Sequence, residues 1–284
     1  MMFHLLVFCI KNTFRHLRTR PVVWIPGVYA GCIAALVIWL EFTGGMFLAG
    51  KIAMLGAVAF PFFLSILNYH LEHDEINPKM LMTVGLRGYF PIILPVVILA
   101  GIVAVMAVLL SVPLSIMGYG DDTYALTGLM LGIGIPAFLF SLYIDNVAVC
   151  ERTKIFDTLK RSMELVTGKI FTAIWFFLIS GIATIITALC GAFLWGAILS
   201  ERFTQFTSMN LTQQQELFST YTLTDWQNLI GPEGTLVTAL VCGLVTFLLV
   251  PFWFTFKYEC YLDATDVVWV MPPEDIDQMR VFKK

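Results

Sequence analysis

A few ionisable side chains at the ends of long apolar segments are the residues that could carry chemistry. Asp145 and Glu259 each follow an apolar run and a tyrosine, where a membrane-spanning helix would end. A charge at the bilayer centre costs about 2.5–3.5 kcal/mol. The cost is smaller near the end of a span, but a carboxylate there still favours a positively charged partner. Arg161, Lys154 and Lys257 offer positive charge nearby. Two chemistries fit: an ion pair that holds helices together, which we favour, or a relay for protons or cations.

A second candidate is the segment His70-Leu-Glu-His73-Asp74. On a helix extending from an apolar run, His70 and His73 would lie one turn apart and could bind a metal ion with Asp74. The order of residues differs from the His-Glu-x-x-His of zinc proteases, and a solvated helix end explains it equally well. We therefore predict neither metal nor cofactor. No Walker loop, Rossmann glycine set or Gly-x-Ser-x-Gly elbow occurs, so no enzyme activity is predicted.

The longest charged island lies between two apolar blocks, at residues 145–169. Its apolar residues recur three or four positions apart: Phe156, Leu159, Met163 and Val166. This pattern predicts an amphipathic basic helix within residues 147–169, with Gly168 as its C-cap, resting on the cytoplasmic face of a membrane. An ordinary charged loop is the alternative.

The same island contains the partners for an ion pair. We expect Asp145 or Glu151 to pair with Arg161 and so to hold the amphipathic helix against the fourth and sixth spans.

Part of the island resembles a motif of the form Glu-x7-Leu-x-Arg-Ser-x2-Leu-x2-Gly. The residues that carry it are Glu151, Leu159, Arg161, Ser162, Leu165 and Gly168. Uncharacterised bacterial and archaeal multipass families share the motif, as does the membrane domain of some glycerophosphodiester phosphodiesterases. Those families usually have Ala and an aromatic residue where this chain has Thr158 and Met163. The resemblance covers residues 142–200, with a weaker echo in the segment from Tyr258 to Asp263.

That resemblance implies a prokaryotic membrane protein without an activity of its own. In the phosphodiesterases the chemistry belongs to a separate soluble domain, for which this chain has no room.

Composition places the chain in a membrane. It is 58% hydrophobic and 13% charged, with a mean hydropathy of +0.83, whereas soluble domains carry about 25% charged residues. The net charge of −3 lacks the strong positive charge that is typical of nucleic-acid-binding proteins. The lipid bilayer is therefore the predicted partner.

Six apolar segments are long enough to span a bilayer, and they predict an all-α protein of three helical hairpins. They cover residues 22–42, 46–68, 88–112, 124–146, 170–200 and 234–260. An interfacial basic helix at 1–20 precedes them, and a cytoplasmic tail at 261–284 follows. Outer loop 201–233 contains two capping-box-like sequences, beginning at Thr212 and Thr224, which predict two short helices.

The basic residues gather on one side of this arrangement. Of the 17 Lys and Arg, 15 fall at one set of span ends: Lys11, Arg15, Arg18, Arg20, Lys79, Arg87, Arg152, Lys154, Lys160, Arg161, Lys169, Lys257, Arg280, Lys283 and Lys284. The positive-inside rule then predicts a cell membrane with both termini in the cytoplasm.

Proline recurs in the even-numbered spans, at Pro61, Pro136 and Pro251, and predicts weakened helices there. The small-residue run Gly132-Ile-Gly134 favours close helix packing over a broken-helix substrate site.

Two functions remain open, besides a distant third, a metal-dependent intramembrane enzyme that uses His70 and His73. The first is a non-enzymatic structural or accessory module, with a protein partner or a second copy bound through loop 201–233 or the amphipathic helices. The second is a small permease or lipid-handling protein that uses the proline-weakened helices. A polar cleft in the bundle would favour the second.

Overall fold

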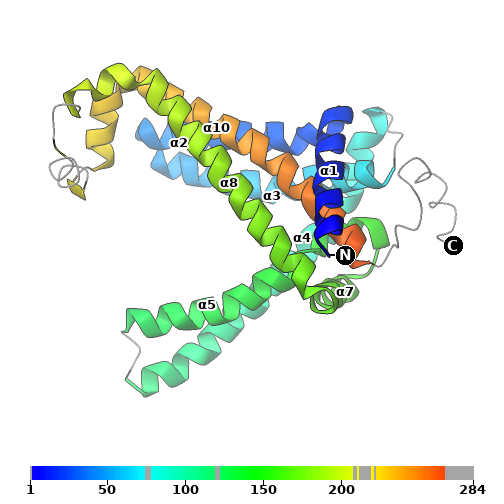
Figure 1. The fold of residues 1–284 in the computed structure, drawn as a ribbon. Helices are drawn as coiled ribbons and strands as arrows, with labels where there is room; N and C mark the ends of the chain where they lie inside the picture. Colours follow the sequence, from blue (N-terminus) through cyan, green and yellow to red (C-terminus); the bar gives the residue numbers. More distant parts are fainter. Residues whose placement is uncertain are drawn as a thin grey trace.

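Figure 1 shows the fold in a computed structural model, which describes residues 2–73, 78–118, 122–206, 210, 219–220 and 222–265. Its elements are α1 (Met2–Thr19), η1 (Pro21–Trp24), α2 (Ile25–Phe42), α3 (Met46–Glu72), α4 (Pro78–Ile116), α5 (Thr123–Phe140), α6 (Ile144–Asn146), the π-helix η2 (Val147–Glu151), α7 (Ile155–Gly168), α8 (Ile170–Ile198), η3 (Ser200–Phe206) and α10 (Leu223–Ala264). None of these described residues forms a strand.

Six helical segments are long and apolar enough to cross a membrane. They are Pro21–Phe42, Met46–Glu72, Met80–Ile116, Leu126–Glu151, Ile170–Ile198 and Thr224–Ala264. The predicted all-α multipass membrane fold is therefore confirmed. Consecutive spans form the three hairpins α2–α3, α4–α5 and α8–α10.

Helices α2 and α10 pack closely against each other, backbone to backbone. A Cβ atom on Gly31 would lie 2.7 Å from the carbonyl oxygen of Gly243, and one on Gly27 would lie 2.6 Å from that of Phe247. No larger side chain fits at either position. Small residues four apart thus allow the two backbones to touch, as in close transmembrane helix pairs.

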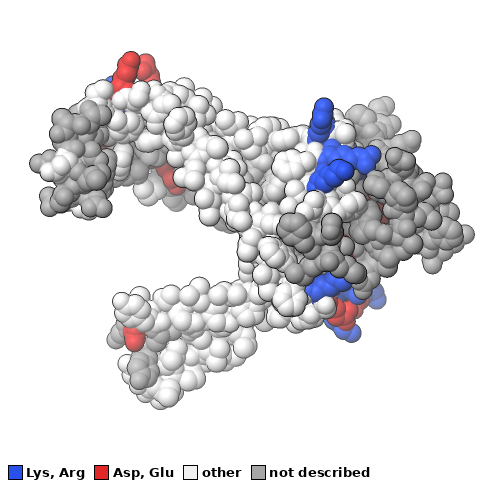
Figure 2. Space-filling model, in the orientation of Figure 1, with Lys and Arg blue, Asp and Glu red and all other residues white. Residues whose placement is uncertain are grey.

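The α4–α5 hairpin leaves the rest of the bundle as a separate arm (Figure 1). Near its beginning α4 packs on α3, where Gly85 contacts the ring of Phe62 and Gly88 contacts Ser65. Farther along, α4 side chains are largely exposed, as at Val108 and the other apolar residues of this stretch. Figure 2 shows the resulting wedge between this arm and the rest of the bundle.

Helices α1 and α7 lie at one end of the bundle, beside the last turns of α10. We call this the basic end, because most of the Lys and Arg visible in Figure 2 gather there. The prediction that basic residues gather at one set of span ends agrees with this distribution.

The fourth span differs from the prediction, because its helix breaks before the basic end. Helix α5 ends at Phe140, a turn follows, and the chain continues through α6 and the π-helix. The hydroxyl of Ser162 compensates for the break. It donates to the Phe140 carbonyl at 2.6 Å and accepts from the Tyr143 amide at 3.2 Å. Backbone groups left unpaired by the broken helix are thereby satisfied.

The amphipathic helix is shorter than predicted. Of residues 147–169, the first five form a π-helix with buried residues, and α7 begins only at Ile155. The buried face of α7 consists of Thr158, Ser162, Leu165 and Val166. Of the predicted apolar stripe, Val166 is fully buried, whereas Phe156 and Met163 are 71% and 44% exposed.

The predicted cap of that helix is also wrong. Gly168 is the last residue of α7, and Lys169 takes the C-cap position. Gly168 is not among the glycines with positive φ in the described chain, so the left-handed cap typical of glycine does not form.

The outer connection ends earlier than the predicted 201–233. Helix α10 begins at Leu223, after a capping box between Thr222 and Asp225 rather than one that begins at Thr224. Gly231, with φ of 67°, breaks the helix near its start. The sequence beginning at Thr212 and the tail 266–284 lie outside the described residues.

Candidate functional site

The last two turns of α10 place polar side chains at alternate positions inside the protein. Lys257, Glu259, Tyr261 and Asp263 are 7%, 1%, 1% and 7% exposed. Residues four apart share a helix face, and residues two apart point to nearly opposite sides. Lys257 and Tyr261 therefore reach the corner after the fourth span, while Glu259 and Asp263 reach other elements.

Lys257 forms a buried ion pair. Its Nζ lies 2.6 Å from both carboxylate oxygens of Asp145, which is in α6. The amide of Asn68 donates to Asp145 Oδ2 at 3.3 Å, and Asn146 donates to Asn68 at 3.2 Å. The Nζ also lies 4.3 Å from the centroid of the Phe254 ring. This network joins three spans, and the predicted partner for Asp145, Arg161, is not the one it contacts.

Glu259 anchors α1. Its carboxylate lies 3.1 Å from His16 Nε2 and accepts a hydrogen bond from Asn12 Nδ2 at 3.2 Å. The Sγ of Cys9 lies 3.9 Å from the Glu259 carbonyl oxygen. Burial, with Glu259 and Asp263 nearby, raises the pKa of the Cys9 thiol to about 12. The N-terminal helix is thus held by polar contacts as well as by apolar packing.

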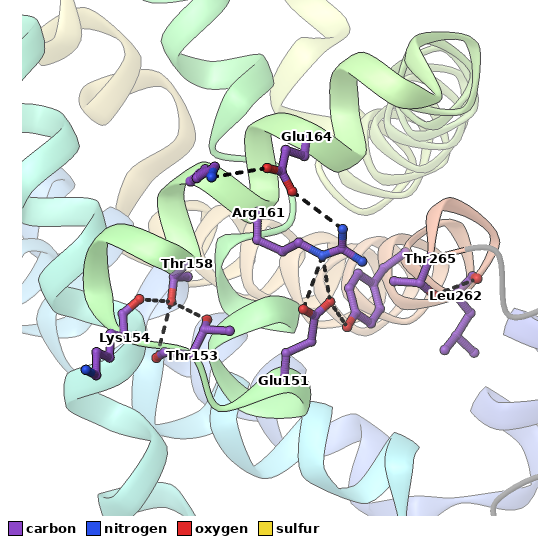
Figure 3. A network of polar contacts seen from close by, with 10 residues as sticks. Glu151, Thr153, Lys154, Thr158, Arg161, Glu164, Leu262 and Thr265 are labelled. Carbon is purple, nitrogen blue, oxygen red and sulfur yellow. Dashed lines mark hydrogen bonds and ion pairs between the residues drawn. The ribbon is translucent and has the colours of Figure 1, made fainter. Parts of the chain in front are cut away.

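Figure 3 shows the contacts around Arg161, whose Nε lies 3.2 Å from Glu151 Oε2. Tyr261 donates to Glu151 Oε1 at 3.0 Å. The guanidinium also lies 3.6 Å from Glu164, one turn along α7. Of the two carboxylates that the sequence offers to Arg161, the structure places Glu151 beside it. Since Arg161 is 39% exposed, solvent weakens this pair.

Asp263 connects α10 to the beginning of α8. Thr172 donates to Asp263 Oδ2 at 2.8 Å. Lys169 Nζ donates to the Asp263 carbonyl at 2.6 Å and lies 3.5 Å from its carboxylate.

A groove of about 450 Å³ lies at the narrow end of the wedge, between α3, α4 and α5. Its walls are the residues Ala57, Phe60, Pro61, Leu64, Ile92, Val96, Leu99, Ala100, Val103, Gly134, Ala137, Phe138, Ser141 and Ile144. At one end it reaches Asp145 and Lys257, the only ionisable residues that line it. A long apolar groove that ends on one ion pair has the form of a site for an amphiphilic molecule.

The prolines and glycines that the sequence singles out in the even-numbered spans lie in different parts of the bundle. Pro61 and Gly134 line the groove, whereas Pro136 does not. Pro251 packs near Gly27, where α2 and α10 meet. The prediction of close packing at Gly132 and Gly134 is wrong, because a Cβ atom on either would meet no described atom within 4 Å.

The histidine candidates do not converge. His70 is buried, while His73 stacks on Tyr69 with ring centroids 4.3 Å apart. Within the described ranges, no group of three His, Cys, Asp or Glu side chains could hold a metal ion. Asp74 lies outside those ranges.

We compared the chain with protein families, curated proteins and solved structures. No protein-family model matches the chain, and no match is found among curated proteins or solved structures. The resemblance of residues 142–200 to the multipass families stays a prediction.

Sequence reasoning missed the polar partners from other helices, namely Asn12, His16, Asn68 and Asn146. Asn68 carries a usable signal, since a primary amide near the end of a membrane-spanning segment needs a polar partner. The Gly27-x3-Gly31 spacing in an apolar helix also signals close packing. Asn12 and His16 carry no such signal, because α1 is amphipathic and polar residues are common there.

Proposed function

We propose that this protein is a non-enzymatic accessory module of a cell membrane that holds a lipid-like molecule in the groove between α3, α4 and α5. The observation that carries the proposal is the groove itself, with uncharged walls and the Asp145–Lys257 pair at its end. Its size lies in the range of about 300–1,000 Å³ in which small-molecule sites are found.

The position of the groove supports binding from the bilayer. Its walls come from α3 and from the α4–α5 arm, and all three helices belong to segments that can cross a membrane. A molecule dissolved in lipid could therefore enter sideways through the wedge. A site for a water-soluble solute would need more polar walls.

The chemistry of the lining supports binding without reaction. Asp145 and Lys257 bond to each other through both carboxylate oxygens. A general acid or base must instead present its proton or lone pair to a substrate.

We further propose that the basic end faces the cytoplasm, following the distribution of Lys and Arg. The exposed side chains of Phe156 and Met163 would then enter the lipid beside α7.

The test fills the groove without disturbing the fold. In α5, the Gly134→Leu change places a side chain in the groove where no described atom blocks it. Gly132→Leu is the matched control, because Gly132 is equally open and does not line the groove. A monoglyceride with a photoreactive chain is added to the purified protein in lipid nanodiscs, and labelled peptides are mapped by mass spectrometry.

We expect labelling at α4 and α5 residues of the groove in the native protein and in Gly132→Leu, and its loss in Gly134→Leu. Equal labelling in all three would mean that chains merely coat the surface, and the proposal would fail.

A second candidate function is the docking of a partner's transmembrane helix in the wedge. It is favoured by the large exposed apolar side chains on the outer part of the α4–α5 arm, including Val108 and Ile116 at 63% and 81% exposed. A photoreactive residue replacing Ile116 would label such a partner in cell membranes, whereas lipid alone would yield no protein adduct.

A further inference from the structure

The groove ends on a pair of opposite charges, and the hydrogen-bonding capacity left on that pair defines what can bind there. This step rests on the proposed function, because it concerns the head group of the molecule that the groove would hold. Chain length contributes little to selectivity, since the bilayer around the protein is as apolar as the groove walls. The polar end of the ligand must therefore decide which lipid is preferred.

The capacity of the pair can be counted. A lysine ammonium has three donor hydrogens, of which Lys257 directs bonds to the two oxygens of Asp145. A carboxylate has about four acceptor positions, and Asp145 uses them for these two bonds and for Asn68. Because the two oxygens of one carboxylate lie close together, a single Lys257 hydrogen can serve both of them, so at least one donor and one acceptor remain. The ammonium is additionally attracted to the Phe254 ring, an interaction of its charge with the ring face.

A single hydroxyl group matches that remainder, because it both accepts and donates a hydrogen bond. Ser141, which lines the same end of the groove, adds another acceptor, since its own hydrogen goes to the Phe138 carbonyl at 2.8 Å.

Charged head groups match less well. Asp145 and Lys257 sum to zero charge, and no other ionisable residue lines the groove. An anionic head could accept a hydrogen bond from the remaining Lys257 donor, but it would be desolvated beside the Asp145 carboxylate, which repels it. A cationic head would be desolvated beside the Lys257 ammonium, which repels it. Burying a charge without a free partner is costly.

We infer that the site binds a long-chain lipid whose head is uncharged and presents a hydroxyl group, such as a fatty alcohol or a monoglyceride, in preference to a fatty acid or a fatty amine. The chain would follow α4 from Ile92 to Val103, a rise of about 16 Å at about 1.5 Å per residue.

The experiment compares three photoreactive probes that share one chain and differ only in the head: an alcohol, a carboxylate and an amine. Each is added to the protein in nanodiscs of uncharged lipid, at a pH where the carboxylate and amine are ionised. We expect the alcohol to label groove peptides about tenfold more than either charged probe, with the signal lost in Gly134→Leu and kept in Gly132→Leu.

Changing the charge of the Asp145–Lys257 pair tests whether its neutrality causes the preference for an uncharged head. In Asp145→Asn, Lys257 keeps its charge without a carboxylate, so preference should move to the carboxylate probe. In the double variant Asp145→Asn/Lys257→Gln, the end of the groove is again uncharged and the alcohol should again be preferred. Circular dichroism and size-exclusion profiles select the variants that fold, and the glycine pair provides the test without altering the ion pair.

The outcomes are distinguishable. Carboxylate labelling equal to or stronger than that of the alcohol in the native protein, still blocked by Gly134→Leu, overturns the hydroxyl inference and leaves the proposed function standing. Labelling that is independent of both head and Gly134→Leu overturns the proposed function itself.

Discussion

Asp145 and Lys257 are 112 positions apart in the chain, yet Lys257 Nζ lies 2.6 Å from both oxygens of the Asp145 carboxylate. The contact joins the broken end of the fourth span to the sixth span, and both side chains are under 10% exposed. It therefore sets the register of α10 against α6 while also forming the polar end of the groove.

Removal of one partner from this pair should be strongly destabilising. We expect Lys257→Met to lower the free energy of unfolding by about 3–5 kcal/mol, because it leaves a buried carboxylate without its counter-ion. The double variant Asp145→Leu/Lys257→Met should recover a large part of that loss. Unfolding by SDS titration in mixed micelles measures both. Additive losses in the double variant would contradict a direct coupling.

Arg161→Ala should act locally. Because Arg161 is 39% exposed, we expect a loss of less than about 1 kcal/mol in global stability. Amide exchange should nevertheless become faster in α7 and the π-helix, which the contacts between Arg161, Glu151 and Tyr261 connect. Lys160→Ala is the control, since Lys160 is 77% exposed and its partner is in the same helix. Unchanged exchange in α7 would rule out a clamp at Arg161.

A side chain at Gly31 should separate α2 from α10. Gly31→Leu places atoms against the Gly243 carbonyl, and we expect a loss of at least about 1–3 kcal/mol from overpacking. Gly101→Leu, at a position with no described atom within 4 Å of its Cβ, should be close to neutral. Thermal aggregation midpoints of the two variants give the comparison; equal midpoints would refute close backbone contact at Gly31.

The Cys9 thiol should resist alkylation. Burial raises its pKa to about 12, so the thiolate is scarce at about pH 8 and increases only as the pH rises toward 12. Glu259→Gln removes a charge that raises this pKa and weakens the anchor of α1, so labelling should become faster. Maleimide labelling followed by peptide mapping measures the rate. Rapid labelling of Cys9 in the native protein would show that α1 detaches from α10.

The orientation of the chain can be read from opposite ends of the bundle. With the basic end in the cytoplasm, Lys160→Cys should react with an impermeant maleimide in inside-out vesicles and not in intact cells. Thr204→Cys, in exposed η3 beyond the end of α8, should give the reverse. The labelled peptide identifies the cysteine. Reaction of Lys160→Cys in intact cells would reverse the proposed topology.

Composition and periodicity sufficed for the spans, because a bilayer demands long apolar helices whatever their packing. They did not reveal the break after Phe140, which depends on a hydroxyl from Ser162, 22 residues later. Nor did they orient α7. Its buried face includes Thr158 and Ser162, whose hydroxyls bond to nearby residues and backbone, while Phe156 faces outward. A helix at a lipid interface can turn apolar residues away from the protein, so hydrophobicity alone does not identify its packed face.

The exposed arm of α4 and α5 has a mechanical consequence. From Gly88, where α4 rests on α3, to Ile116 at its far end, the helix rises about 42 Å. A rotation of only about 5° at that fulcrum would displace the tip by roughly 4 Å over this length. A small change in packing around Ser65 therefore produces a much larger displacement at the tip of the hairpin. Bilayer thickness or lateral tension could set the size of that displacement.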